Sequence, residues 1–299
     1  GTGAMEAAVT NTLSPGDKVI CASIGSFGDR FGKIARCFGA NVSMLNFSPG
    51  TAINPETLRN ALKANEDVKA VLVTHNETNT GVTNDLESIS QIVKGEFNKL
   101  LLVDGISSVC SIPLKSDEWG CDVVVSASQK GWMLPPGLAF ISFSKRAWEA
   151  YSTSSMPKFY FDLAQYKQMY DIGQPPFTPS ISIMFGLEIS LKKILEEGMP
   201  SIYLRHQTTG KIIRDGVKSI GLSLFPKESI ASNTVTAIKV PNNVVADELI
   251  KTLEEKHQVT VAGGYGSLKG KIFRIGHLGY VSQSEIDGVL NALSETIPE

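Results

Sequence analysis

The sequence has 299 residues, 42% of them apolar and 19% charged, which suits one large or two unequal globular domains with a substantial core. Its 28 basic and 30 acidic residues leave a net charge of −2 without a basic patch, which argues against nucleic acid as the main partner. No apolar run approaches the roughly 18 residues that a membrane span needs, and no signal-peptide pattern is visible.

The cysteines and histidines form no recognisable site. The four cysteines have no CxxC or paired spacing, and the four histidines are scattered along the chain. We therefore expect small buried thiols, a reducing compartment (the cytoplasm or a reducing organelle) and no metal site.

From residue 18 to about 145, short Val/Ile/Leu-rich runs alternate with amphipathic stretches. Strands are expected at 18–23, 41–47, 68–75, 99–104, 121–127 and 137–144, and helices at 4–13, 29–39, 54–65 and 84–97. Nearly continuous apolar strands separated by helices predict an α/β fold: a mostly parallel sheet with helices on both faces.

The C-terminal third has a different pattern. Residues 144–172 show no clear period, and 178–198 read as a long amphipathic helix. Beyond it, helices at 247–256 and 284–295 alternate with polar strands at 235–240 and 271–276. We expect a large domain over 1–198 and a smaller α+β domain over 199–299.

Chemically useful side chains follow several of the predicted strands. Phe27 follows the first strand, "NETNTG" the third, Asp104 ends the fourth, and Lys130 follows the fifth in "SASQKGWMLPPG". Open α/β sheets bind ligands beyond the carboxyl ends of their strands. A lysine beside a buried strand is costly unless its chemistry is used, so this edge of the sheet is the candidate site.

Pyridoxal phosphate needs three of the features present here. These are a lysine that forms a Schiff base, a carboxylate for the pyridinium nitrogen, and a glycine-led helix start for the phosphate. "GTG" runs directly into the helical "AMEAAVTNTL". Taken singly, these features also describe a solvated lysine, a helix cap and a cloning scar, but their combination and order favour the cofactor site.

Six stretches resemble one known family. "GTGAMEAA", "GSFGDRF", "THNETNTGV", "LLVDGISS", "SASQKGWMLPPGLAF" and "GGYGSLKGKIFRIGHLGY" resemble the class V aminotransferases of fold type I, closest to the alanine–glyoxylate and serine–glyoxylate branch. The resemblance implies pyridoxal phosphate, amino transfer from alanine or serine to a 2-oxo acid such as glyoxylate, and a homodimer. It also implies that "GTGAMEAA" is the phosphate-binding turn and that the family's preceding segment is absent.

The resemblance implies a role for each matching residue. Lys130 would form the Schiff base and move a proton between the substrate α-carbon and the cofactor, and Asp104 would pair with the pyridine nitrogen. Phe27 would stack on the ring, with a core phenylalanine as the alternative. Thr78 would contact the ring hydroxyl region, unless it only forms a turn. Arg274 would grip the substrate α-carboxylate.

The phosphate site draws on both ends of the large domain. The resemblance implies that Gly1, Thr2 and Gln129 bind the phosphate. It also implies that Thr178 reaches the phosphate of the neighbouring subunit, although Pro175 stands where some relatives have Tyr. Alternatively, Thr178 caps the long helix. His75 and Trp132 are expected to pack rather than to catalyse.

Two other functions remain open at this point. A desulfurase-like lyase would share the fold, but such enzymes carry a cysteine in the C-terminal part, and none follows Cys121. A non-catalytic partner subunit of a soluble hydrogenase is the other alternative, since a hydrogenase itself needs iron bound by cysteine clusters. The sequence determines neither the amino donor nor the acceptor.

Overall fold

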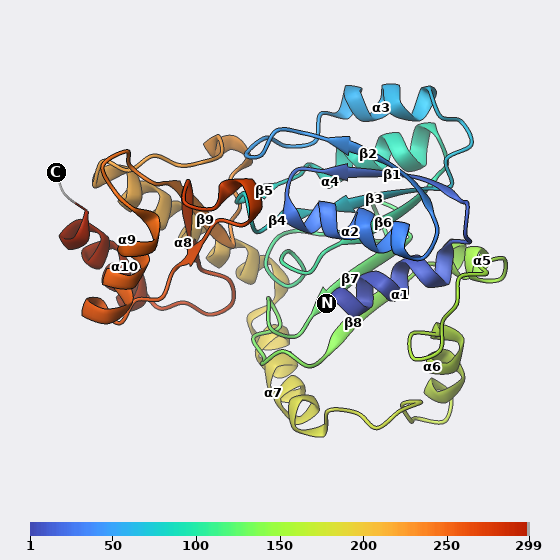
Figure 1. The fold of residues 1–299 in the computed structure, drawn as a ribbon. Helices are drawn as coiled ribbons and strands as arrows, with labels where there is room; N and C mark the ends of the chain where they lie inside the picture. The colour runs from blue at the N-terminus through green and yellow to red at the C-terminus, as the bar shows by residue number, and fades with distance from the viewer. Residues whose placement is uncertain (298–299) are drawn as a thin grey trace.

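The centre of the molecule is a six-stranded sheet with the strand order β2-β1-β3-β6-β7-β8. The computed structural model describes residues 1–297 (Figure 1). The strands are β1 (Lys18–Ser23), β2 (Asn41–Asn46), β3 (Ala70–Thr74), β6 (Leu100–Asp104), β7 (Val123–Ala127) and β8 (Ala139–Phe143). All neighbouring pairs are parallel except β7 and β8. The predicted mostly parallel α/β sheet is confirmed.

The antiparallel edge follows from the length of one connection. Only residues 128–138 join β7 to β8, and a parallel return needs a crossover of a dozen residues or more. The chain therefore turns back beside β7. This short connection also contains Lys130.

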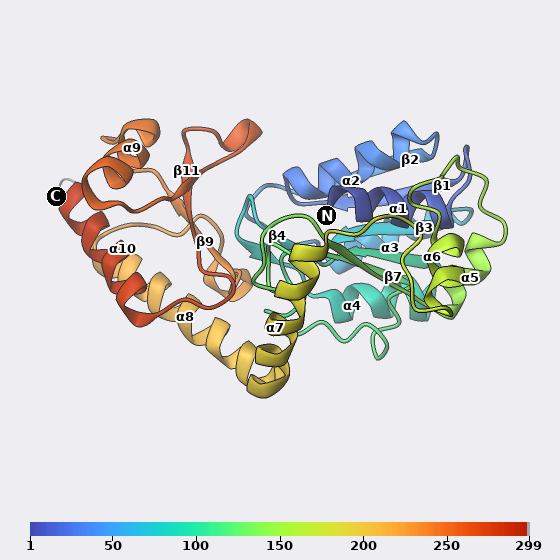
Figure 2. The same ribbon diagram turned by 90° about the horizontal axis from the view of Figure 1, so that it is seen from below.

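Helices cover both faces of the sheet, as the apolar strands require. One core cluster contains Val19, Cys21 and Leu72, and a second contains their neighbours Ile20 and Val71. Alternate residues of each strand thus face opposite layers. Figure 2 shows α1 (Thr2–Thr12) and α2 (Ser26–Cys37) on one side and α4 (Leu86–Ser90) on the other; α3 (Pro55–Lys63) packs with α4.

Two local expectations need correction, and one segment without a clear period gains detail. The helix expected over 84–97 is α4 followed by a π-helix at Gln91–Glu96, whose wider turn buries both Ile92 and Val93. Residues 144–172 contain two short helices, α5 (Lys145–Tyr151) and α6 (Leu163–Tyr170), too poor in buried residues to show a period. All four cysteines are free, but Cys37 is exposed whereas the other three are buried.

The long helix predicted near the end of the large domain is present as α7 (Ile181–Glu197). Gly198, at a φ of 75°, separates it from α8 (Met199–Ser219), a 21-residue helix that the sequence pattern does not reveal. The expected domain boundary falls at this break, and the division into two domains stays a prediction.

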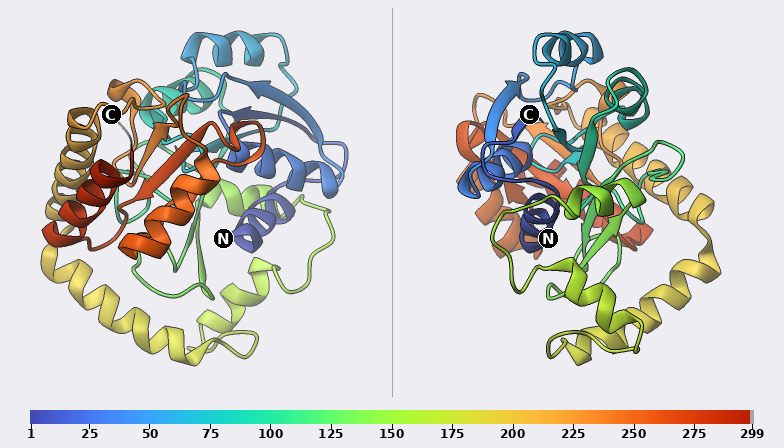
Figure 3. Two further views of the ribbon diagram at one scale, coloured as in Figure 1. Left: turned by 60° about the vertical axis from the view of Figure 1, so that its left-hand side comes forward. Right: turned by 90° about the vertical axis from the view of Figure 1, so that its right-hand side faces the viewer.

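The C-terminal part is built on a small antiparallel sheet of order β10-β11-β9 (Figure 3). Its strands are β9 (Val235–Lys239), β10 (Ala262–Gly263) and β11 (Ile272–Gly276), covered by α8, α9 (Ala246–His257) and α10 (Gln283–Thr296). The sequence predicts polar strands, but four of the five residues are buried in both β9 and β11. Each strand packs a hydrophobic face on the helices, with Ile238 and Phe273 in that core.

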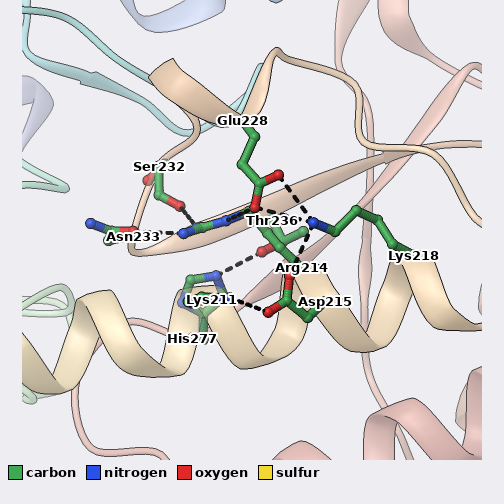
Figure 4. Close-up of polar contacts among 9 residues, drawn as sticks. All are labelled: Lys211, Arg214, Asp215, Lys218, Glu228, Ser232, Asn233, Thr236 and His277. Carbon is green, nitrogen blue, oxygen red and sulfur yellow. Dashed lines mark hydrogen bonds and ion pairs between the residues drawn. The ribbon is translucent and has the colours of Figure 1, made fainter.

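A buried arginine joins this part to the large sheet. Arg214 of α8 donates to the backbone oxygen of Ser232 at 3.0 Å and to the side chain of Asn233 at 3.2 Å (Figure 4). Ser232 in turn donates its backbone N–H to the oxygen of Gly81, at the turn that follows β3 and β4 (Asn76–Glu77), at 2.8 Å. The network therefore helps to fix the small sheet against the edge where the candidate site lies. No helix of residues 1–297 is long and apolar enough to cross a membrane.

Candidate active site

The predicted residues meet at the carboxyl edge of the sheet. A cavity of about 560 Å³ opens there, between the start of α1, the start of α2 and the turn after β7. Five of the residues proposed from the sequence line this cavity: Gly1, Thr2, Phe27, Gln129 and Lys130. Ile106 also lines the cavity, and its backbone N–H donates a hydrogen bond to the carboxylate of the buried residue Asp104.

Lys130 occupies a turn that holds it close to the buried sheet. Its backbone N–H donates to the oxygen of Ala127 at 3.3 Å. The next residue is Gly131, where a Cβ would lie 2.2 Å from the oxygen of Val109, so a side chain there would displace the turn. Burial and the charge of Arg274 lower the pKa of the lysine, while Asp104 opposes this effect. A lower pKa raises the fraction of neutral amine, the nucleophilic form.

Asp104 is a buried carboxylate without a cationic partner. One oxygen accepts the N–H of Ile106 at 2.9 Å and the other accepts the hydroxyl of Thr74 at 3.4 Å. Within residues 1–297 no lysine, arginine or histidine forms an ion pair with it. Burial raises its pKa to about 6. A cationic N–H of a ligand beside the carboxylate would offset the free-energy cost of burying its charge.

Glu77 is a site residue that the sequence pattern does not single out. It is fully buried, and its carboxylate accepts three backbone N–H groups: Phe27 at 3.0 Å, Gly28 at 3.2 Å and Asn79 at 3.1 Å. Burial raises its pKa to about 7. Glu77 thus anchors the first turn of α2 and positions the ring of Phe27. The only signal in the sequence is an acidic residue inside the polar loop "NETNTG".

A basic face of α2 borders the same cavity. The guanidinium carbon of Arg30 lies 4.9 Å from the centre of the Phe27 ring, and Nη1 donates to the hydroxyl of Thr2 at 3.4 Å. Lys33 lines the cavity one turn further along. The spacing of Phe27, Arg30 and Lys33 places them on one helical face, so the sequence period could have identified both basic residues.

Arg274 lies in β11, with 5% of its surface exposed. Nε and Nη2 donate to the oxygen of Gly263 at 3.1 and 2.7 Å, and Nη1 donates to the oxygen of Thr78 at 3.0 Å. These bonds use three of the five guanidinium N–H groups, leaving one on each Nη. These acceptors are neutral carbonyl oxygens, which do not neutralise the guanidinium. Its positive charge therefore remains available to an anionic ligand. Burial lowers its pKa.

Thr78 and Thr178 have different surroundings. Thr78 donates its hydroxyl to Ser107 at 3.1 Å and supports Arg274 through its carbonyl. Thr178 is exposed and does not line the Lys130 cavity of its own chain. It lines a second, mostly apolar cavity of about 760 Å³, which also touches Gly1 and Gln129. Thr178 does not cap α7, because Ser180 occupies that position.

His75 and Trp132 are packed, as expected. His75 is buried against the edge of Trp119, and burial lowers its pKa to about 4. Trp132 donates Nε1–H to Ser126 at 2.8 Å and packs on Phe140. No group of His, Cys, Asp and Glu in residues 1–297 is arranged to hold a metal ion.

Comparison with known proteins covers almost the whole chain. Residues 1–289 match the family model for aminotransferase class-V. The chain is 39% identical to serine–glyoxylate aminotransferase of Arabidopsis thaliana, over 97% of this chain and 74% of that protein. It is 41% identical to a protein named the small subunit of a soluble hydrogenase from Synechococcus sp., over 100% of this chain and 78% of that one.

Solved structures agree with this assignment. Alanine–glyoxylate aminotransferase from Nostoc sp. superposes with a TM-score of 0.95 at 31% identity, over 99% of this chain and 79% of that one. A cysteine desulfurase from Thermococcus onnurineus reaches a TM-score of 0.76 at 15% identity and shares the fold alone. The lysine turn, the buried carboxylate and the family match over nearly the full sequence lead to one conclusion: this chain belongs to the class-V aminotransferase family.

Proposed function

We propose that this protein is a pyridoxal-phosphate-dependent aminotransferase that moves the amino group of a small amino acid, alanine or serine, to a 2-oxo acid such as glyoxylate. The position of Lys130 carries the proposal: it lines the cavity, and both Asp104 and Arg274 lie near enough for their charges to act on its amine. The names of the similar glyoxylate aminotransferases support the acceptor.

The residues present fit the cofactor. Asp104 supplies an unneutralised carboxylate for a protonated ring nitrogen, and the half-buried ring of Phe27 supplies a stacking surface. At Gly1 a Cβ would lie 2.8 Å from Cδ1 of Ile106, so a larger residue there would require that side chain to move. Free N–H groups at that start, with Thr2 and Gln129, would bind the phosphate.

Pyridoxal phosphate, when bound, supplies an electron-accepting ring that stabilises negative charge at the substrate α-carbon. Lys130 would hold the cofactor covalently; once displaced, its Nζ would accept the α-proton and return it. The free N–H groups on Nη1 and Nη2 of Arg274 would bind the substrate α-carboxylate in two parallel hydrogen bonds. Glu77 would keep Phe27 in its stacking position.

The assembly belongs to the same proposal. Large apolar side chains are exposed along residues 159–204, on α6, α7, α8 and the segments that flank α6: Phe159, Tyr160, Tyr170, Ile172, Ile181, Met184, Phe185, Ile189, Leu195 and Leu204. Such a surface is typical of an interface. We infer a homodimer that covers this surface and brings Thr178 to the partner's phosphate site. The free cysteines support the cytoplasm or a reducing organelle.

Three measurements test the proposal against its alternatives. In single-turnover experiments, alanine or serine should change the visible spectrum of the bound cofactor, and glyoxylate should restore it. If no amino acid changes the spectrum, the aminotransferase assignment fails. Co-purification with a second subunit that contains iron would instead favour the hydrogenase partner suggested by the names of two relatives. Release of sulfide from cysteine would favour the lyase.

A further inference from the structure

A third cavity, smaller than the other two, lies directly beside the Lys130 cavity. It measures about 190 Å³, and polar groups dominate its lining: Ser23, Asp29, Asn46, Asn79 and Thr80. Ser26 and Tyr265 line both cavities, so these two residues form the wall between them. Nothing in the proposed reaction uses this polar cavity.

Tyr265 is held in this wall by its backbone. Its N–H donates to Oδ1 of Asn79 at 2.9 Å, and Nδ2 of the same asparagine donates to the hydroxyl of Ser26 at 2.9 Å. Asn79 thus ties the loop before β11 to the first residue of α2. The Tyr265 side chain itself is 57% exposed, and its ring centre lies 4.9 Å from the guanidinium carbon of Arg274.

This geometry limits where a substrate side chain can go. The proposed function directs the α-carboxylate to Arg274 and the α-amino group to Lys130. Tyr265 lies against Arg274 and forms the boundary of the polar cavity on that side. A substrate side chain that reaches from the Lys130 cavity into the smaller cavity would have to pass Tyr265 or Ser26.

We propose that Tyr265 determines substrate specificity by closing the polar cavity to the amino-acid side chain, an inference that rests on the function proposed above. With the ring removed, the cavity would admit a carboxamide, because Asn46 and Asn79 offer amide donors and acceptors. It would still exclude a second carboxylate, because Asp29 lines the same space and its carboxylate already accepts the Ser23 hydroxyl at 2.7 Å. Asparagine and glutamine, but not aspartate and glutamate, would become donors.

The test compares Tyr265→Ala with Tyr265→Phe, which keeps the ring. Tyr280→Ala is a matched control, because Tyr280 is also exposed and also stacks on an arginine, Arg205, at 5.3 Å. The kcat/KM ratio of glutamine to alanine should rise about tenfold or more in Tyr265→Ala. It should stay near the wild-type ratio in the other two variants, and glutamate should remain a poor donor in all of them.

Binding of unreactive acids provides a readout that does not depend on turnover. Titration calorimetry with propionate and with succinamate, an acid that ends in a carboxamide, should show a gain for succinamate alone in Tyr265→Ala. Equal affinities for succinamate in Tyr265→Ala and wild type would overturn the role of Tyr265. Succinamate binding could improve in Tyr265→Ala while no amino acid changes the cofactor spectrum. In that case the proposed function fails, but the inference that Tyr265 closes the polar cavity holds.

Discussion

The guanidinium of Arg274 donates from Nη1 to the backbone oxygen of Thr78 at 3.0 Å, so the arginine of the small sheet is bonded to the turn beside the large one. Together with the two bonds to Gly263, this contact fixes the orientation of the guanidinium. Its position depends on two segments that lie 196 residues apart in the chain.

Replacing Arg274 tests the carboxylate site. Arg274→Leu should raise KM for alanine and for glyoxylate, because a desolvated bidentate pair contributes about 2–5 kcal/mol. Cofactor absorbance should be unchanged, and amines without a carboxylate should react as before. Arg274→Lys keeps the positive charge but loses the two parallel guanidinium donors, so it should give an intermediate KM. Wild-type KM values in Arg274→Leu would show that the carboxylate binds elsewhere.

Asp104→Asn should stabilise the cofactor-free protein while abolishing its activity. Burial raises the pKa of Asp104 from 3.8 to about 6, so between these pH values the folded chain binds a proton that the unfolded chain does not. The free energy of unfolding therefore falls as pH rises through this range, and the loss is complete above about pH 6. Asparagine removes the buried charge.

The expected gain is about 1–3 kcal/mol at pH 8 and about half of that at pH 5. Urea unfolding of both proteins at the two pH values measures it. If the variant and the wild type differed in free energy of unfolding by the same amount at pH 5 and pH 8, the buried carboxylate would not be the source of the gain. With the cofactor bound, the order should reverse, because the variant lacks the partner for the ring nitrogen.

Arg214 supports the contact between the two sheets (Figure 4). Arg214→Met should lower the free energy of unfolding by about 2–4 kcal/mol, because the acceptors on Ser232 and Asn233 lose their donors in a buried setting. Lys211→Met is the control: it removes a cation from the same helix, where its pair with Asp215 is exposed. A loss of the same size in both variants would refute a special role for Arg214.

The exposed face of α7 should be a subunit interface. A charge placed among its apolar residues, as in Phe185→Glu combined with Ile189→Glu, should convert the proposed dimer into a monomer with little activity. Lys251→Glu, at an exposed position of α9, should leave the dimer intact. Sedimentation velocity distinguishes the two, and a fully active wild-type monomer would contradict the interface.

Local patterns reveal the elements whose burial is simple. The strands β3, β6 and β7 are apolar because both faces are buried, and the positions of their carboxyl ends are enough to locate Asp104 and Lys130 from the sequence. The long helix α8 is hidden in the sequence because its buried residues are of mixed type, including His206, Thr209 and Arg214. Strand β11 has Arg274 at its centre and therefore reads as a polar strand in the sequence. Tertiary contacts nevertheless bury four of its five residues.

The site residues that the sequence pattern misses depend on contacts between distant segments. In the sequence, Glu77 is one more polar residue in a loop. Its role is visible only in the structure, where its carboxylate accepts N–H groups from the start of α2. Tyr265 gains its position only when Asn79 holds its loop against the large sheet. Neither relationship has a sequence period, so pattern alone does not find them.

The most direct test of the proposed function is the identity of the lysine that holds the cofactor. Borohydride reduction of the yellow protein, followed by peptide mapping, should place the cofactor on the peptide that contains Lys130. Lys130→Ala should still bind the cofactor without covalent attachment and should lose turnover by orders of magnitude. Recovery of the label on Lys145, Lys158 or another lysine, with Lys130 unmodified, would contradict the proposed role of Lys130.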